Sequence, residues 1–197
     1  MKPLTNLTGR VAVLDRADVD TDQIMPKQFL KRIERSGYGE FLFFDWAKDP
    51  EFELNRPEYA GAQILITGRN FGCGSSREHA AWGLEDAGFR VVIAPSFGDI
   101  FRANAVKNGM APIELRDSAL AELKAAVLDT NELTVDLEQL EITHPGGLRV
   151  PFQLDPYSRE TLLHGLDDIA RTLKREEKIA AYESSVRPRF DARAVSA

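Results

Sequence analysis

Short apolar runs alternate with segments of helical pattern along most of this chain. The runs at Val11–Leu14 and Arg90–Ala94 are rich in β-branched residues, which favours buried strands. Three later runs are closely spaced, and Pro145-Gly146-Gly147 predicts a turn between the last two, as in an antiparallel meander. The seven predicted strands are 11–14, 63–67, 90–94, 112–115, 133–137, 140–143 and 148–154.

Helical signals fall between and after these runs. Gly109 suits the position just after a helix C-terminus. Asp155 followed by Pro156 suits an N-cap and a first-turn proline. The predicted helices are 78–87, 99–108, 117–128 and a longer one that starts at 155 and runs on toward Tyr182. One buried stripe is expected along the last helix, formed by Leu162, Leu166, Ile169 and Leu173.

The stretch from Ala17 to Pro57 follows neither pattern. Its first half is charged and its second half is aromatic, with Phe41, Phe43, Phe44 and Trp46. A segment of this length within a compact domain is usually functional or mobile. We consider two interpretations: a loop over a site with a short helix inside it, or an irregular surface excursion whose aromatic side chains pack into the core.

Composition narrows the class of protein. The 197 residues suit one domain with a real core, and 43% hydrophobic with 28% charged residues is ordinary globular composition. The net charge of −6 disfavours a dedicated nucleic-acid binder. No apolar run reaches the ~18 residues of a membrane span, and the N-terminus lacks a signal sequence. We therefore expect a cytoplasmic protein with neither a nucleic-acid nor a membrane partner.

Cysteine and histidine content limits metal chemistry. The chain has one cysteine, Cys73, and three histidines. It can form no intrachain disulfide, and it lacks the thiolates for a Cys-rich zinc site or an iron–sulfur cluster. Any such cluster must be held by another chain.

The most informative stretch is 67–80, TGRNFGCGSSREHA, where a predicted strand ends, a glycine-rich loop turns and a helix begins. Glycines let a backbone approach a ligand closely, and a helix N-terminus offers free N–H groups. Arg77 adds a planar charged group that suits a carboxylate or a phosphate. The stretch therefore favours a small anion, although its spacing fits neither a Walker A loop nor a dinucleotide-binding fingerprint.

These residues also have structural interpretations. Ser75 and Glu78 have the spacing of a capping box, so Ser75 could serve only as a helix cap, and Ser76 could replace it. Asn70 suits a turn. Arg77 in a first helical turn opposes the helix dipole, which argues against an idle surface arginine.

Residues 70–80, NFGCGSSREHA, resemble the swivel-domain signature of the aconitase superfamily. The stretch 14–31, LDRADVDTDQIMPKQFLK, resembles the opening of the small subunits of bacterial 3-isopropylmalate dehydratase (isopropylmalate isomerase). Segments 101–109 and 166–169 also fit that family, and the similarity covers residues 1–184. It implies an α/β fold, a swivelling β/β/α domain of the aconitase C-terminal type with a mostly parallel central sheet flanked by helices. Residues 185–197 are expected to form a flexible C-terminal tail.

The resemblance also implies an activity. The family isomerises 2-isopropylmalate to 3-isopropylmalate in leucine biosynthesis, by removing water and returning it at the neighbouring carbon. It implies that Ser75 is the general base, Arg77 the clamp for a substrate carboxylate and Ser76 a hydrogen-bond donor. A helix N-terminus and an adjacent guanidinium would favour the alkoxide form of Ser75. The expected partner is a large subunit, in a heterodimer or higher heteromer, that holds a [4Fe–4S] cluster, while this chain binds no cofactor.

Further residues take substrate-binding or positioning roles by the same resemblance: Asp20, Thr21, Asp22, Asn70, Gly72 and Gly74. The alternative for the Asp-Thr-Asp triplet is a turn whose carboxylates accept nearby backbone N–H groups. Residues 28–39 correspond to the family's substrate-specificity loop. Its candidate residues are Phe29, Leu30, Lys31, Arg32 and Ile33.

The apolar members of this loop suit an isopropyl group, but one methylene discriminates by only ~1–3 kcal/mol. Two alternatives therefore remain open. The chain could be the small subunit of a related hydro-lyase, of citraconate/methylmalate or homoaconitate type. It could also be a non-catalytic anion-binding assembly module in which Ser75 merely caps a helix.

Overall fold

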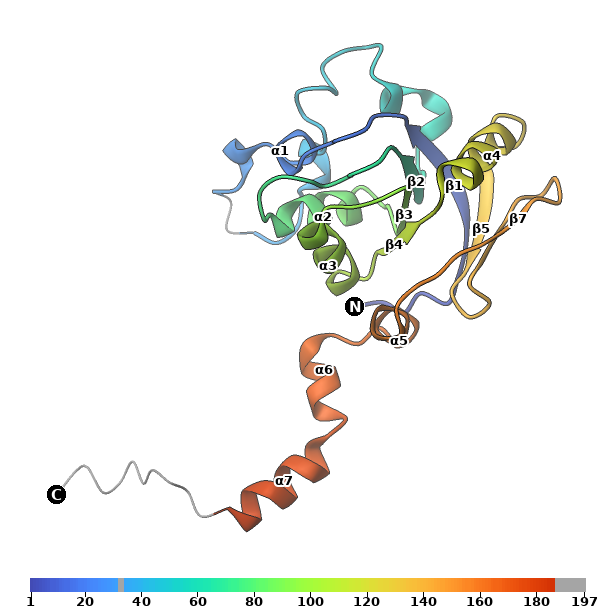
Figure 1. Ribbon diagram of the computed structural model, residues 1–197. Helices are drawn as coiled ribbons and strands as arrows, with labels where there is room; N and C mark the ends of the chain where they lie inside the picture. Colours follow the sequence, from blue (N-terminus) through green and yellow to red (C-terminus); the bar gives the residue numbers. More distant parts are fainter. Residues whose placement is uncertain (32–33, 187–197) are drawn as a thin grey trace. The chain divides into compact units, whose positions relative to one another are not determined.

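The computed structural model describes residues 1–31 and 34–186. The chain divides into two compact units, Met1–Gly165 and Leu166–Ala197. The strands of the described residues lie in the first unit and form one sheet in the order β4-β3-β2-β1-β5-β6-β7 (Figure 1). They are β1 (Asn6–Leu14), β2 (Ile64–Thr67), β3 (Val91–Ala94), β4 (Ala111–Glu114), β5 (Glu132–Asp136), β6 (Glu141–Thr143) and β7 (Arg149–Pro151). Each predicted strand is therefore confirmed, with shifted ends.

β1 joins a parallel half of the sheet to an antiparallel half. Its C-terminal part pairs parallel with β2, and β2, β3 and β4 continue in parallel. Its N-terminal part pairs antiparallel with β5, and β5, β6 and β7 form the predicted meander. A single antiparallel bridge between Glu114 and Gln153 links the outer edge of β4 to the chain just after β7. The sheet is therefore curled, with its two ends brought together.

The two faces of the sheet bury different hydrophobic cores, because side chains alternate along each strand. Ile64 and Ile66 face a core that also includes residues of α4 (Asp117–Val127) and α5 (Pro156–His164), whereas Leu65 faces the other. That second core is covered by α2 (Glu78–Asp86) and α3 (Asp99–Lys107), which contact each other (Figure 1). The predicted helices 78–87, 99–108 and 117–128 are confirmed.

The segment 17–57 combines both interpretations offered for it. It contains the short helix α1 (Thr21–Ile24) and the 3-10 turns η1 (Lys27–Phe29), η2 (Gly39–Phe41) and η3 (Glu53–Asn55), and η4 (Pro57–Tyr59) follows. Phe43 and Phe52 are buried in the second core. Part of the segment therefore packs as an irregular excursion, while α1 reaches the loop described below.

The prediction of one long C-terminal helix is wrong. Asp155 does cap α5, with Pro156 at its start, but Gly165 has φ 62° and ends that helix in the left-handed conformation. The second unit then contains α6 (Asp168–Leu173) and α7 (Glu176–Ser185). Ile169 and Leu173 are exposed, at 72% and 58%, so the expected stripe is buried only at its beginning.

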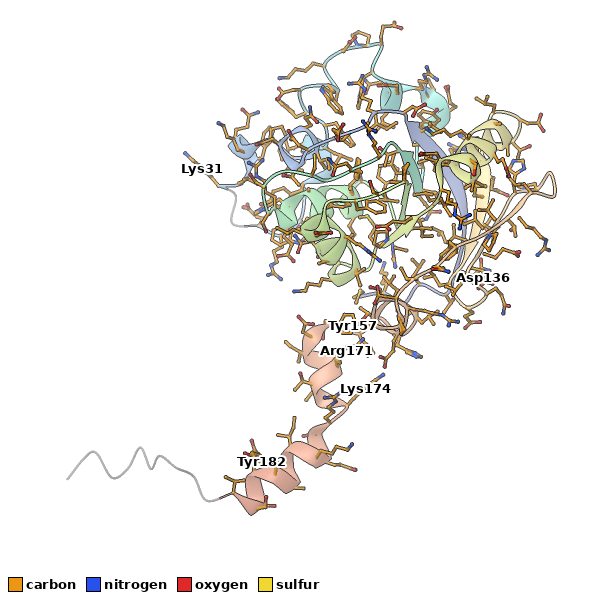
Figure 2. All side chains as sticks on the ribbon, in the orientation of Figure 1. Lys31, Asp136, Tyr157, Arg171, Lys174 and Tyr182 are labelled. Atoms are coloured by element: carbon orange, nitrogen blue, oxygen red, sulfur yellow. The ribbon has the colours of Figure 1, made fainter. Side chains whose placement is uncertain are left out.

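The side chain of Tyr182 projects from α7 (Figure 2). The predicted tail 185–197 lies outside the described residues from position 187 onward. Within the described residues, the helices are too short or too polar to cross a membrane.

Candidate active site

The glycine-rich loop lies at the edge of the sheet where β1, β2 and β3 all end. Because these strands are parallel, their carboxyl ends meet at one edge, and the segments 15–20, 68–77 and 95–98 follow them there. Ligands of open α/β sheets bind at such edges. The topology therefore brings the Asp-Thr-Asp triplet and the serine-arginine motif together from distant parts of the sequence.

Backbone hydrogen bonds join the first two of these segments. The Gly72 N–H donates to the Val19 carbonyl (2.7 Å), and the Thr21 N–H donates to the Cys73 carbonyl (2.9 Å). The buried Thr21 hydroxyl donates to the Ser75 carbonyl (2.9 Å). Thr21 thus holds the backbone of Ser75 directly.

α2 begins later than the sequence suggests. Its N-cap residue is Arg77, which has extended backbone angles (φ −136°, ψ 108°) and makes no side-chain cap hydrogen bond. The first helical residue is Glu78, so Ser75 and Ser76 precede the helix. The capping-box interpretation of Ser75 is therefore wrong. The structure offers no capping role that would explain this serine.

Ser75 and Ser76 are exposed on the loop. Neither hydroxyl makes a hydrogen bond to the described part of the chain, and Ser75 is held through its backbone carbonyl alone. An exposed hydroxyl with a fixed backbone is available to a ligand. Its neighbour α2 presents a helix N-terminus, where partial positive charge favours an anion.

Arg77 forms a two-pronged ion pair with Asp22. Its Nη2 donates to Oδ2 of Asp22 (2.7 Å), and its Nη1 contacts Oδ1. The hydrogen bond and charge of Arg77 are the main reasons why the pKa of Asp22 is lowered, and Asp22 in turn raises the pKa of Arg77. Only 13% of the Arg77 side chain is exposed, so the guanidinium is oriented before any ligand arrives.

Asp20 has a structural role. It caps α1, with its carboxylate accepting from the Gln23 N–H (2.8 Å) while the Gln23 side chain accepts from the Asp20 N–H (2.9 Å). This matches the turn interpretation for that residue. The three residues of the triplet therefore have different roles. Asp20 caps α1, Thr21 bonds to the backbone of Ser75, and Asp22 orients Arg77.

Asn70, Gly72 and Gly74 shape the loop backbone. All three have positive φ, at 56°, 72° and 87°. A Cβ at Gly72 would lie 2.2 Å from the ring of Phe101, so only glycine fits there. The Asn70 amide donates to Asp18 (2.8 Å), so this side chain also bonds within the protein.

The predicted specificity loop is described only in part, because Arg32 and Ile33 lie outside the described residues. Phe29 stacks on Phe41 at a ring distance of 4.2 Å, and Leu30 is half-buried against the second core. Lys31 is exposed and points away from the sheet (Figure 2). The aromatic half of the loop is therefore anchored to the protein.

The donor atoms of this chain do not fit an iron–sulfur cluster. Burial, followed by the charges of Asp20 and Asp18, raises the pKa of the single cysteine Cys73, which disfavours its thiolate form. Across residues 1–31 and 34–186, no three His, Cys, Asp or Glu side chains come together to hold a metal ion.

Two residues at the site were not predicted. Asp18 accepts from Asn70, and Ser96, after β3, accepts from the Asn70 N–H through its hydroxyl (2.9 Å). Asp18 stands in the acidic opening motif, so its position was a signal. Ser96 stands in Pro95-Ser96-Phe97 and has no local signal beyond following a buried strand.

The fold and the loop together define a domain of the aconitase C-terminal class. The family model described as the aconitase C-terminal domain matches residues 1–118. A crystal structure titled 3-isopropylmalate dehydratase, from Methanocaldococcus jannaschii, has the same fold, with a TM-score of 0.65 and 24% identity over 90% of this chain and 99% of that one.

Relatives with higher sequence identity show which family within this class the chain belongs to. Proteins named 3-isopropylmalate dehydratase small subunit are 55% identical in Bacillus licheniformis, over 93% of this chain and 96% of that protein, and 55% identical in Rhodopirellula baltica, over 94% and 99%. The Geobacillus kaustophilus protein of that name is 53% identical over 96% and 100%. This chain belongs to the family of 3-isopropylmalate dehydratase small subunits, which confirms the predicted resemblance and fold class.

Proposed function

We propose that this chain, together with a large subunit, isomerises 2-isopropylmalate to 3-isopropylmalate in leucine biosynthesis. The observation that carries the proposal is the 53–55% identity to small subunits of 3-isopropylmalate dehydratase over nearly the whole length of both chains. The chain supplies one half of a hydro-lyase site. The [4Fe–4S] cluster of such an enzyme is assigned to the large subunit, and the complex to the cytoplasm.

Arg77 binds a substrate carboxylate. Its guanidinium has five N–H donors in a fixed plane, and Asp22 engages Nη1 and Nη2. Because Nη1 is buried, the donors that suit a substrate carboxylate are Nε and the second N–H of Nη2, in the same plane. Asp22 is a positioning residue here, because it orients the guanidinium and balances its charge without touching the substrate.

Ser75 moves the proton. As an alkoxide it takes a proton from the substrate carbon next to a carboxylate, the electron pair of that C–H bond forms the double bond, and hydroxide leaves the adjacent carbon. When water adds in the opposite sense, the Ser75 hydroxyl returns the proton to the carbon that lost the hydroxide. Its exposed hydroxyl, the N-terminus of α2 and the Arg77 side chain two residues away support this role.

Ser76 and the specificity loop supply further contacts to the substrate. The exposed Ser76 hydroxyl donates a hydrogen bond to the bound diacid. Phe29 and Leu30, anchored to the second core, contribute apolar surface for the isopropyl group. The glycines at 72 and 74 and the Thr21 hydroxyl hold the loop in place, and the Asp20 side chain caps α1.

A reconstitution tests the function. The full chain is mixed with a cluster-loaded large subunit, and the absorbance of the unsaturated intermediate, dimethylcitraconate, is followed after isopropylmalate is added. We expect turnover only when both chains are present. Turnover with citraconate or methylmalate instead would move the protein to a related hydro-lyase. Stable association without turnover of any diacid would favour the assembly module.

A further inference from the structure

Three residues, one from each loop at the carboxyl edge, are connected by hydrogen bonds. Asp18 follows β1, Asn70 follows β2 and Ser96 follows β3. The Asn70 Nδ2 donates to Asp18 Oδ1 (2.8 Å), and the Asn70 backbone N–H donates to Ser96 Oγ (2.9 Å). We call these three residues the three-loop latch. Asn70 is its centre, because it binds both neighbours at once.

Two latch residues have an unusual backbone conformation. Asp18 has φ 55° and Asn70 has φ 56°, in the left-handed region that L-residues seldom adopt. Asp and Asn tolerate this region better than other non-glycine residues. The Asp18 N–H also donates to the Arg69 carbonyl (2.9 Å), so each of the two turns helps to hold the other. Such conformations persist where surrounding contacts determine them, and they concentrate at functional sites.

The latch stands at the start of the segment that ends at Ser75. Just after Asn70, the Phe71 N–H donates to the Ser96 carbonyl (3.1 Å), and the Gly98 N–H donates to the Phe71 carbonyl (2.9 Å). On the other side the segment is held by Val19 and by Thr21, as described above. Residues 70–75 therefore run between two neighbouring loops, and the latch fixes the point where they enter.

We infer that the three-loop latch positions Ser75, by setting the path of residues 70–75 between the loops that follow β1 and β3. The inference rests on the proposed function, in which Ser75 moves the proton. Asp18, Asn70 and Ser96 are positioning residues and do not touch the substrate. Because Asp18 engages the Asn70 amide, the contact supports positioning over substrate binding for Asn70.

The first test compares two asparagine–aspartate pairs in the reconstituted complex. Asn70→Ala removes the latch bond, whereas Asn6→Ala removes the hydrogen bond from Asn6 to Asp136 in the β1–β5 pair, away from the site. We expect kcat to fall about 10- to 100-fold for Asn70→Ala, the scale of a small misplacement of a catalytic group, with KM nearly unchanged. Asn6→Ala should keep wild-type values. Equal kcat for the two variants, or a rise in KM with kcat unchanged, overturns the inference.

Rescue and coupling separate positioning from general stability. Asp18→Asn keeps an acceptor and tolerates the left-handed conformation, so it should stay close to wild-type kcat, whereas Asp18→Ala should match Asn70→Ala. The double variant should be no slower than either single one, because both remove the same bond. Additive losses, or failure of Asp18→Asn to rescue, contradict the latch. If Asn70→Ala does not fold, Asn70→Gly replaces it, since glycine accepts the positive φ without the side-chain bond.

A readout without turnover distinguishes this inference from the proposed function. Hydrogen exchange is measured on the full chain alone, at the amides of Gly72 and of Thr21, which are bonded across the loops. We expect exchange at least about tenfold faster in Asn70→Ala than in Asn6→Ala, as local opening becomes easier. If the wild-type complex turns over no isopropylmalate, the proposed function fails and this comparison still decides the latch. Unchanged exchange in Asn70→Ala rejects it.

Discussion

The parallel and antiparallel halves of the sheet organise their connections differently. In the parallel half, three consecutive carboxyl ends share one edge, so Asp22 and Arg77, 55 positions apart, form an ion pair. In the antiparallel half, β6 and β7 are joined by a short turn that the Gly147 N–H closes on the His144 carbonyl (2.9 Å). The connection from β6 to β7 is therefore local, although β5 also pairs with the distant β1. The parallel topology gathers reactive groups from distant segments, and the meander supplies the scaffold.

Removing the Ser75 hydroxyl should have the largest effect. Ser75→Ala should lower kcat of the reconstituted complex at least ~100-fold, the lower range for loss of a general base. Its free energy of unfolding should stay within about 0.5 kcal/mol of wild type, because an exposed side chain that caps no helix is lost. Steady-state kinetics and urea unfolding measure the two quantities.

The control is Ser118→Ala, an exposed serine in the first turn of α4, remote in sequence from the loop. It should leave kcat unchanged. Full turnover by Ser75→Ala in an intact complex would show that another group is the base. The parallel half of the sheet would then not be the half that supplies this catalytic residue.

Substitutions at two glycines compare how tightly the parallel and antiparallel halves of the sheet are packed. Gly72 and Gly147 both have positive φ, at 72° and 93°. A Cβ would lie 2.2 Å from the Phe101 ring at Gly72, but would meet nothing within 4 Å at Gly147. Gly147→Ala should cost about 1 kcal/mol for backbone conformation alone. Gly72→Ala should cost roughly 2 kcal/mol or more, because overpacking is added. Equal midpoints in denaturant would mean that the Phe101 ring moves freely and that the parallel edge is not tightly packed.

Replacing Arg77 by lysine should have a smaller effect. Arg77→Lys replaces a planar group by a point charge, so KM for isopropylmalate should rise about tenfold, equivalent to roughly one charge-assisted hydrogen bond. The matched control is Arg16→Lys, which alters another two-pronged pair, Arg16 with Glu53 (2.9 and 2.8 Å), whose guanidinium lies over the Trp46 ring. KM should be unchanged there. A tenfold rise in both variants would point to a general effect on the domain and would remove the clamp role from Arg77.

The sequence predicts the local elements of this fold well. Each strand is marked by an apolar run, and the end of α3 is marked by Gly109, which has φ 80°. The prediction of one long C-terminal helix failed because a glycine interrupts a continuous apolar pattern. Gly165 after His164 stops α5, although the apolar spacing continues to Leu173. That spacing indicates an amphipathic segment but does not show what, if anything, covers it.

The site could be predicted in its residues but not in its contacts. Ser75 and Glu78 have a capping-box spacing, yet the bond from Thr21 to the Ser75 carbonyl and the extended backbone of Arg77 delay the helix. The bond between Asn70 and Ser96 also depends on which strands are neighbours. Such pairings follow from sheet order, which periodicity does not specify.

The smallest expected effect concerns His79, at the start of α2 on the parallel side. Its ring packs against Tyr38 and Trp82, at 5.3 and 4.6 Å, and burial lowers its pKa. As the pH falls, the His79 side chain therefore takes up a proton in the unfolded chain before it does so in the folded chain. Its contribution to the free energy of unfolding is fully present above the ordinary histidine pKa and is lost as the pH drops below that value. His79→Phe keeps the ring packing without the titrating group. Its free energy of unfolding should fall less than that of wild type between pH 7.5 and about 5.5, the range in which an ordinary histidine titrates. Parallel losses in the two proteins would place the acid sensitivity in other groups and leave His79 as a packing residue only.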